Sequence, residues 1–443
     1  MNALGRLEHI VNLACEELPK VRVGGIVTEV TPTHYRVSGL SRFLKLGECV
    51  SFGNSERLQY GEVVRLDDLG TTVKTFEPNV ETGLGEFAYR VGPLRLAPHP
   101  NWKGRVIDAL GRPIDSAGPM PRGEHMVSVE SAPPAAMERT RVKRPLRSGV
   151  RVIDLFTPIC AGQRIGIFAG SGVGKSTLLA MLAGSKGFDT VVIALVGERG
   201  REVREFLDDA LAANRKVAVT VVSTGDESPM MRRLAPKTAM TIAEFFRDRG
   251  DSVLLIVDSV TRFAHAARDV ALAAGEPPVA RGYTPSVFSD LPKLLERAGP
   301  GKEGDGAITG IFSVLVDGDD HNDPVADCIR GTLDGHIVLD RSIADQGRFP
   351  AVNVLSSISR LANHAWSKEQ QNLVMKLRAL IARFEDTRDL RLMGGYQPGQ
   401  DADLDQAVSL VPKIYEAMMQ SPSDKASEDA FRELAETLQP KAS

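Results

Sequence analysis

Residues 164–182 read RIGIFAGSGVGKSTLLAML, which is an apolar run, a glycine-rich loop and a second apolar run. This order predicts a buried strand, a tight loop and a helix. Gly170, Gly172 and Gly174 allow the loop backbone to curl so that successive N–H groups point inward. Together with the positive end of the following helix, such groups attract anions. The stretch therefore predicts a phosphate-binding loop inside an α/β domain.

The loop also matches the pattern of a nucleoside-triphosphate site, with Ala169 at the first position and Gly174-Lys175-Ser176 at the end. Lys175 is expected to reach the β- and γ-phosphates, and the Ser176 hydroxyl is expected to bind magnesium. The predicted ligand is therefore Mg-ATP. The residues expected to surround its phosphates are Ala169, Gly170, Ser171, Gly172, Val173, Gly174, Lys175, Ser176 and Thr177.

A second feature is the apolar stretch VLLIVD, residues 253–258, which ends in Asp258. A carboxylate at the end of such a strand can hold a magnesium-bound water. The alternative is an ordinary cap of a helix or turn, a frequent role of aspartate. The phosphate loop upstream favours the magnesium role.

A third feature is Glu198, which directly follows the strand-like run TVVIALVG, residues 190–197. Parallel α/β sheets bind their ligands at this carboxyl edge. A glutamate there can orient or deprotonate the water that attacks the γ-phosphate. From sequence position alone, a surface ion pair with the adjacent charged residues is an equally good interpretation. Those residues are Arg199, Arg201 and Glu202.

The rest of the chain predicts three domains behind a short N-terminal helix. Short β-rich runs in residues 21–96 indicate a small antiparallel barrel. Residues 97–362 alternate near-continuous apolar strands with helices, which indicates a parallel sheet buried on both faces. Residues 363–443 carry helical apolar stripes and predict a helical domain. The overall class is α/β, with a β-barrel before the nucleotide domain and a helical domain after it.

Residues 1–20 predict an amphipathic helix. Its apolar side chains recur at helical spacing and are Leu4, Leu7, Ile10, Val11, Ala14 and Leu18. Such a helix either packs on its own domain or binds a partner, and the pattern does not separate these roles.

The composition restricts the possible classes of protein. A length of 443 residues is typical of two or three domains, and a formal net charge of −3 provides no strongly basic surface for nucleic acid. The four cysteines are scattered, which indicates a reducing compartment rather than a disulfide framework. The N-terminus lacks the features of a signal peptide, and no run approaches the roughly 20 apolar residues that cross a bilayer. We therefore expect a cytoplasmic protein that reaches the membrane only through partners.

Over roughly residues 20–420 the chain resembles the rotary-ATPase superfamily, and within it the ATPases of flagellar and other type III export systems. The stretches that carry the resemblance are GRVIDALGRPID, the segment from Gly149 through the phosphate loop, VGERGREV, DESPMMRR, VDSVTRFAHAARDV, GEPPVARGYTPSVFSDLPKLLERAG and DGDDHNDPVADCIRGTLDGHIVLDR. The loop AGSGVGKST and the segment RGYTPSVF are more similar to export ATPases than to the catalytic subunits of ATP synthase.

The resemblance implies a homohexamer of one catalytic subunit and gives roles to single residues. Glu198 becomes the catalytic carboxylate, Arg199 a neighbouring phosphate-site cation and Asp258 the acid of the magnesium site. Arg360, which position alone would mark only as a solvated arginine, matches the arginine finger that acts on the γ-phosphate in the adjacent subunit. Lys175 completes the catalytic set.

The resemblance also implies an adenine site and several partners. Phe349 and Tyr396 match the aromatic positions that flank adenine. The implied partners are a peripheral regulator at the N-terminal helix, a central stalk protein, the membrane proteins of the export gate, and export chaperones with their substrates. The motif GDDHNDPVAD favours the flagellar branch over the injectisome branch.

The chain departs from the family pattern at three places. Ala169 replaces the first loop glycine, and residues 357–366 and 416–427 follow no clear family version.

Three other functions are disfavoured by the sequence. A catalytic subunit of ATP synthase is disfavoured by the loop sequence. An RNA translocase like the Rho termination factor is disfavoured by the charge, and a non-catalytic nucleotide-binding subunit by the presence of Glu198.

Overall fold

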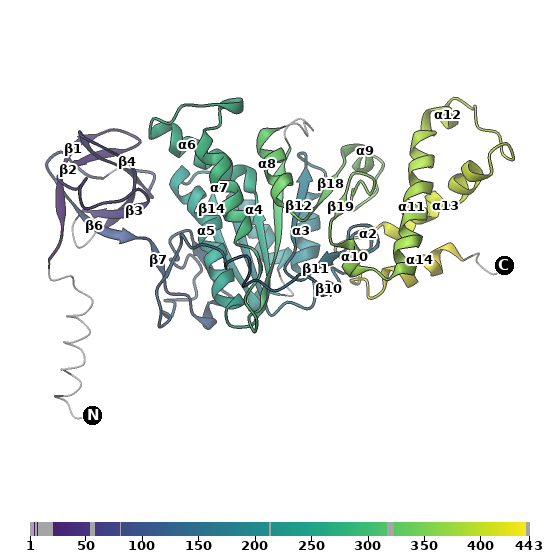
Figure 1. The fold of residues 1–443 in the computed structure, drawn as a ribbon, viewed down its shortest axis with the longest axis horizontal. Coiled ribbons are helices and arrows are strands. Elements are labelled where there is room, and N and C mark those ends of the chain that lie inside the picture. Colours follow the sequence, from purple (N-terminus) through teal and green to yellow (C-terminus); the bar gives the residue numbers. More distant parts are fainter. Residues whose placement is uncertain are drawn as a thin grey trace. The chain divides into compact units, whose positions relative to one another are not determined.

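The short strands and the parallel sheet that the sequence predicts are both present in the computed structural model (Figure 1). The structure describes Leu4, Leu7 and residues 21–53, 58–79, 81–211, 214–316 and 323–439. Apart from Leu4 and Leu7, the amphipathic helix predicted for residues 1–20 lies outside the described residues. The chain divides into two compact units: residues 1–95 with 228–230 and 269–277, and the remainder.

The first unit contains a closed barrel of six strands in the order β1-β2-β5-β4-β3-β6. All neighbouring strands are antiparallel. Closure leaves no sheet edge with unpaired backbone groups, which strands this short would otherwise expose. The barrel is filled by apolar side chains, among them Tyr35 and Phe52, whose rings meet edge to face at 4.7 Å. The strands are β1 (Gly24–Val30), β2 (Tyr35–Ser38), β3 (Glu48–Phe52), β4 (Gln59–Asp67), β5 (Gly70–Thr75) and β6 (Phe87–Pro93).

The second unit is built on a nine-stranded sheet in the order β19-β18-β12-β17-β15-β13-β14-β8, with β16 paired to β17. The strands from β18 to β8 are parallel, whereas β19 and β16 run antiparallel to their neighbours. The strands are β8 (Val106–Asp108), β12 (Arg164–Ala169), β13 (Thr190–Glu198), β14 (Ala218–Thr224), β15 (Ser252–Asp258), β16 (Gly299–Pro300), β17 (Ala307–Leu315), β18 (Gly335–Leu339) and β19 (Ile358–Ser359).

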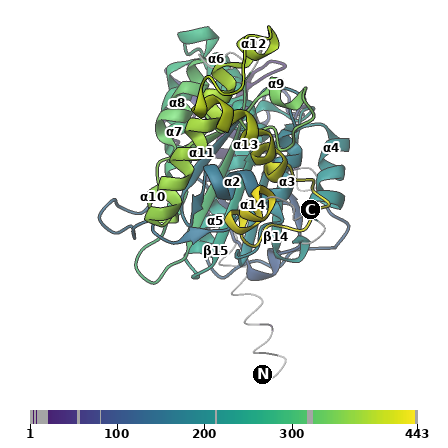
Figure 2. The same cartoon turned by 90° about the vertical axis from the view of Figure 1, so that its right-hand side faces the viewer.

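Helices lie on both faces of this sheet (Figure 2). Because both faces are covered, β13, β15 and β17 are buried along nearly their whole length. The predicted α/β class and the predicted barrel are therefore confirmed. The helices are α3 (Lys175–Ala183), α4 (Gly200–Glu205), α5 (Pro229–Arg247), α6 (Val260–Ala273), α7 (Pro285–Glu296), α8 (Pro324–Thr332) and α9 (Arg341–Ala344).

Helices fill the C-terminal part, as predicted. α11 (Lys368–Asp386) starts at a capping box in which Ser367 and Gln370 satisfy each other's backbone N–H groups. Asp401 caps α13 (Ala402–Met418) and Asp429 caps α14 (Ala430–Leu438). Short helix α12 (Arg388–Leu392) follows α11, and α10 (Ala362–Ala365) precedes it.

The C-terminal helices share one apolar core with the nucleotide domain. α13 and α14 both contact α2 (Arg151–Phe156), which leads into the sheet (Figure 2). Val374 and Ile381 of α11 and Ile414 of α13 belong to the same buried cluster as the sheet residues. The helices are therefore held directly against the domain that carries the phosphate loop. The predicted boundaries at residues 20, 96 and 362 stay a prediction.

Candidate active site

The glycine loop lies at the carboxyl end of β12 and leads directly into α3. Gly172 and Gly174 have φ angles of 78° and 88°, in the left-handed region that favours glycine. Gly174 occupies the cap position of α3, so no side chain competes for the first amide groups of the helix. The loop therefore presents free N–H groups and a positive helix end at one point, which is the geometry of an anion site.

Other residues of the loop are held by the surrounding fold. Val173 is buried, and the Arg341 guanidinium donates a hydrogen bond of 3.0 Å to the Ser171 carbonyl. Ser176 and Thr177, in the first turn of α3, are exposed. Their hydroxyl groups are thus accessible at the mouth of the loop.

Lys175 joins the two carboxylates that the sequence singles out. Its ammonium group contacts the Asp258 carboxylate directly and lies 3.8 Å from Oε1 of Glu198. Glu198 and Asp258 end β13 and β15, and Lys175 begins α3 after the loop that follows β12. These strand ends meet at one edge because the strands are parallel. The structure therefore brings Lys175, Glu198 and Asp258 together beside the phosphate loop.

Asp258 is 3% exposed and is held in place from two sides. The Ser313 hydroxyl donates a hydrogen bond of 2.7 Å to Oδ1, the same oxygen that Lys175 contacts. The orientation of the carboxylate next to Lys175 is thus fixed by β17.

Glu198 faces into this cluster, and its side chain is only 12% exposed. Burial and the nearby Asp258 charge raise the Glu198 pKa to about 7, although Lys175 and Arg262 act in the opposite direction. Within the described part of the chain, its Oε1 has no hydrogen-bond partner. A buried carboxylate with one unsatisfied oxygen and a pKa near neutrality can accept a proton from a nearby water.

Arg199 lies differently. Its side chain is 72% exposed and pairs with Glu202 at 3.6 Å. The inward direction of Glu198 therefore disfavours the surface-ion-pair interpretation for Glu198, whereas Arg199 does lie in such a pair. The structure does not place Arg199 against Lys175.

Arg262, which the sequence reasoning missed, occupies the position beside Glu198. Its guanidinium lies 3.4 Å from Oε2 of Glu198, and its side chain is 29% exposed. Arg262 belongs to the first turn of α6, four residues after Asp258. A basic residue four positions after a strand-terminal aspartate could have been identified from the sequence as a site residue. The first turn of the helix after such a strand lies at the edge of the sheet where ligands bind.

A cavity of about 550 Å³ opens beside the loop. We call it the P-loop cavity, and its lining includes Gly174, Thr177, Phe349, Met419, Gln420 and Pro422. The Phe349 ring lies close to Gly174, with 3.5 Å between the ring and the position that a β-carbon on Gly174 would occupy. Phe349 is thus placed where an aromatic ring could stack on a base whose phosphates lie in the loop.

The far wall of the P-loop cavity comes from residues 419–424, inside the segment 416–427 that follows no family pattern. The sequence carried no signal for this wall. Tyr396, by contrast, does not belong to the lining, and its hydroxyl donates a hydrogen bond of 2.7 Å to Asp405. The structure therefore brings Phe349, but not Tyr396, to the loop.

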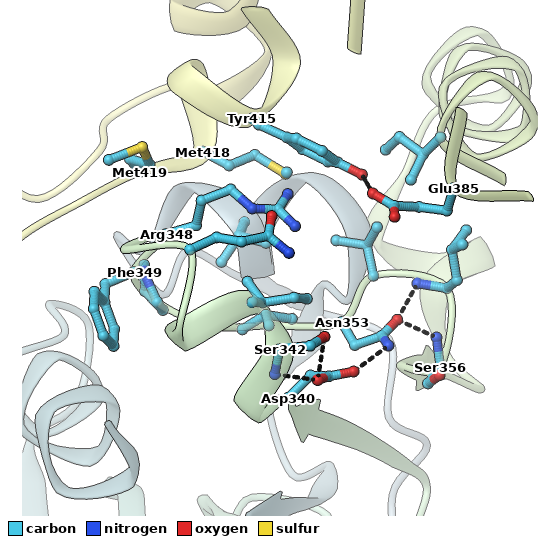
Figure 3. A pocket seen from close by; sticks show the side chains of 18 of the residues that line it. Asp340, Ser342, Arg348, Phe349, Asn353, Ser356, Glu385, Tyr415, Met418 and Met419 are labelled. Carbon is cyan, nitrogen blue, oxygen red and sulfur yellow. Dashed lines mark hydrogen bonds between the residues drawn. The ribbon is translucent and has the colours of Figure 1, made fainter. Parts of the chain in front are cut away.

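Behind Phe349 lies a second cavity of about 320 Å³, which we call the Arg348 cavity (Figure 3). The Arg348 guanidinium lies over the ring of Tyr415, 3.8 Å from its centroid. The Tyr415 hydroxyl donates a hydrogen bond of 2.5 Å to Glu385. The residue next to Phe349 is thus attached to α13 and, through it, to α11.

Arg360 lies at the opposite end of the sheet. It is exposed, and its backbone N–H donates to the carbonyl of Asp334, just before β18. The last residue of β18, Leu339, pairs with Ala169 at the phosphate loop. At strand geometry the run from Asp334 to Leu339 spans about 16 Å. Arg360 is therefore remote from the loop of its own chain.

The fold and the site define a P-loop ATPase. Residues 149–359 match the model of the ATP synthase alpha/beta family, nucleotide-binding domain, and residues 366–436 match that of the T3SS EscN ATPase C-terminal domain. The chain belongs to the family of flagellum-specific ATP synthases. It is 59% identical to the flagellum-specific ATP synthase of Rhizobium meliloti (strain 1021) over 94% of this chain and 89% of that protein.

Solved structures agree with this assignment. The assembled ATPase EscN from the enteropathogenic E. coli type III secretion system aligns with a TM-score of 0.87 and 39% identity, over 93% of this chain and 99% of that one. EscN in complex with its central stalk EscO gives a TM-score of 0.85 and 38% identity over the same shares. In the described parts of the present chain, none of the helices combines the length and the apolar character needed to cross a bilayer.

Proposed function

We propose that this chain hydrolyses Mg-ATP as the motor of a flagellar protein export apparatus, where it assists chaperone release and export. The observation that carries the catalytic part is Glu198, a buried carboxylate with a pKa raised to about 7 next to the phosphate-loop lysine. The flagellar role is supported by 59% identity to a flagellum-specific ATP synthase, against 39% to the secretion ATPase EscN.

The nucleotide is bound from two sides in this proposal. The loop N–H groups and Lys175 hold the phosphates, together with the Ser176 and Thr177 hydroxyls. Phe349 packs on the base in the P-loop cavity. In the present structure Lys175 contacts Asp258 instead, and its ammonium turns toward the phosphates when they supply the negative charge.

Ser176 and Asp258 fit a magnesium site. Mg²⁺ prefers oxygen ligands and binds through one or two protein groups, phosphates and water. The Ser176 hydroxyl is exposed at the start of α3, and the Asp258 carboxylate is fixed by Ser313 at the adjacent strand end. When bound, Mg²⁺ would neutralise charge on the β- and γ-phosphates.

Glu198 acts as the base for the attacking water. Its free Oε1 accepts a hydrogen bond from that water, orients it and takes its proton. Arg262 holds the other oxygen of the carboxylate, and its positive charge keeps the Glu198 pKa from rising further. Arg199 directly follows Glu198 and precedes α4. An inward movement of α4 would bring its guanidinium to the phosphate site.

Arg360 acts in a neighbouring subunit. Arg360 is exposed, and the run along β18 that separates it from the phosphate loop of its own chain is about 16 Å long. This position suits a residue that contacts the γ-phosphate bound to another chain. An arginine supplied in trans can contribute about 10³–10⁵ in rate. The arrangement requires a closed ring, for which a homohexamer is the proposed form.

Several partners belong to this proposal. We assign a central stalk protein to the ring because EscN assembles with its stalk EscO. A regulator at the N-terminal helix, the export gate, and chaperones with their substrates complete the set, and nucleic acid has no role. The protein is cytoplasmic and reaches the inner membrane only through these partners.

The test is the specific ATPase activity as a function of protein concentration, for the wild type and Glu198→Gln, with and without RNA. We expect wild-type activity per subunit to rise steeply as the ring assembles, to be unaffected by RNA and to be lost in Glu198→Gln. Activity that is strictly proportional to protein concentration would argue against a residue supplied in trans. Stimulation by RNA would instead support a translocase of the Rho type.

A further inference from the structure

Gln420 is a buried glutamine in the wall of the P-loop cavity, with 5% exposure. Glutamine side chains usually stay solvated unless their amide groups are satisfied by the protein. We infer that Gln420 is a positioning residue for the nucleotide base, which holds Phe349 and the 419–424 wall at a fixed separation. This inference rests on the proposed ATP site.

The first connection is to Phe349 itself. The backbone N–H of Gln420 donates a hydrogen bond of 2.9 Å to the Phe349 carbonyl. The two walls of the cavity are therefore joined directly, at the residue whose ring faces the loop. Figure 3 shows Phe349 and Met419, the residue before Gln420, on the same side of the neighbouring Arg348 cavity.

The second connection is made by the side chain, which reaches the start of α2. Its Oε1 accepts a hydrogen bond of 2.9 Å from the Arg151 N–H, and its Nε2 donates one of 2.9 Å to the Gly149 carbonyl. A backbone N–H can only donate and a carbonyl can only accept, so the orientation of the amide is determined. Aspartate or leucine could not make both bonds.

The Arg151 guanidinium reinforces this junction. It donates a hydrogen bond of 2.8 Å to the Met419 carbonyl and pairs with Glu433 of α14 at 2.7 Å. Since α2 leads into β12 and the phosphate loop, the wall is tied to the same segment that carries the phosphate site. Gln420 thus connects the base side of the cavity to the phosphate side.

Loss of the side chain has a defined consequence. The half-buried Arg151 N–H loses its acceptor, whereas the Gly149 carbonyl keeps a second donor, the Ser427 N–H. The 419–424 wall keeps the Arg151 guanidinium bond at Met419 but loses both amide bonds of Gln420, so it shifts more easily. Phe349 shifts with it, because its carbonyl stays bonded to the Gln420 N–H. Gly172 and Lys175, which are proposed to hold the phosphates, do not line the cavity that this wall closes. Base binding should therefore weaken while phosphate binding stays.

The experiment compares Gln420→Ala and Gln420→Glu with the wild type. Gln420→Glu keeps the volume and the acceptor for the Arg151 N–H but turns a second acceptor toward the Gly149 carbonyl. It therefore breaks the other bond of the amide and tests the same junction if the alanine variant fails to fold. We expect the KM for ATP to rise about tenfold, as for a lost buried hydrogen bond, with kcat within about twofold. The inhibition constant of inorganic tripolyphosphate, which lacks a base, should not change. Gln406→Ala, at an exposed glutamine of α13, is the matched control.

A double variant separates positioning from general destabilisation. If Gln420 acts through Phe349, then adding Gln420→Ala to Phe349→Ala should raise the KM little beyond Phe349→Ala alone. Fully additive effects would overturn the inference, as would an unchanged KM or an equal loss of tripolyphosphate binding. A wild-type enzyme without ATPase activity would instead contradict the proposed function itself.

Discussion

The Arg262 guanidinium lies 3.4 Å from the Glu198 carboxylate, at the edge of the sheet where the phosphate loop ends. An opposite charge at this distance ordinarily lowers the pKa of a carboxyl group. Burial and the Asp258 charge outweigh it here, and the Glu198 pKa is raised to about 7. The Glu198 pKa thus depends on opposing effects, burial and Asp258 raising it and Lys175 and Arg262 lowering it. The contribution of Arg262 can be removed by mutation.

The first prediction concerns the pH dependence of ATP hydrolysis. As a base, Glu198 must be ionised, so kcat/KM should fall as the pH drops below about 7. In Arg262→Gln the Glu198 pKa should rise further, and the acidic limb should move to higher pH by about one unit. The measurement is kcat/KM from pH 5.5 to 9. Arg204→Gln, at an arginine that is 83% exposed, is the control. A limb that stays in place or moves to lower pH would contradict this account of Glu198.

The second prediction concerns stability without nucleotide. The Glu198 pKa is about 7 in the folded chain, against an ordinary value of 4.5. Between these values the folded state retains a proton that the unfolded state releases, so stability is lost as the pH rises from 4.5 to about 7. Glu198→Gln removes this loss. Its Tm should exceed that of the wild type by about 2–4 °C at pH 8 and by much less at pH 4.5. Thermal shift assays at several pH values measure the difference, and a constant difference would disprove the linkage.

Much of the fold was predictable because it rests on local patterns. The glycine loop between two apolar runs predicts a strand, a loop and a helix, and the structure has β12, the loop and α3 there. Where local patterns are weak, they do not give the element boundaries. Of the stretch KVAVTVV, residues 216–222, only the part from Ala218 lies in β14, because residues 215–217 form a 3-10 turn. Helix α5 starts at Pro229, since proline is favoured in a first helical turn, and it continues through a second proline, Pro236.

The site residues were predictable only where the adjacent sequence marks their position, as at the end of an apolar strand. Strand ends identified Glu198 and Asp258, because parallel strands end at one edge. The raised Glu198 pKa depends on burial and on charges from three other elements, which no local pattern contains. The wall at Gln420 is also a long-range feature, since its partners Gly149 and Arg151 lie about 270 positions earlier in the sequence. Arg360 stands apart, because its proposed target belongs to another subunit.

The third prediction concerns the junction between the Phe349 segment and the C-terminal helices. Tyr415→Phe keeps the ring under Arg348 but removes the hydrogen bond to Glu385, and it should cost about 1 kcal/mol of unfolding free energy. Tyr415→Ala also removes the ring and should cost about 3 kcal/mol. Urea denaturation measures both. Tyr396→Phe, which removes an equivalent hydroxyl from a half-buried residue outside the Arg348 cavity, should change the midpoint less. Equal effects of all three variants would contradict a structural role for the Arg348–Tyr415 contact.

The last prediction uses the separation between Arg360 and its own phosphate loop. Arg360→Ala and Glu198→Gln should each be inactive when prepared alone, because every site in such a ring lacks one group. In a mixed ring, a site is complete when an Arg360→Ala subunit supplies Glu198 and its Glu198→Gln neighbour supplies Arg360. Random mixing in equal amounts should therefore restore about a quarter of the sites of a closed ring. The ATPase activity of the mixture, after dissociation and reassembly, is the measurement, and each variant reassembled alone is the control. A mixture as inactive as its components would show that Arg360 does not act across the subunit boundary.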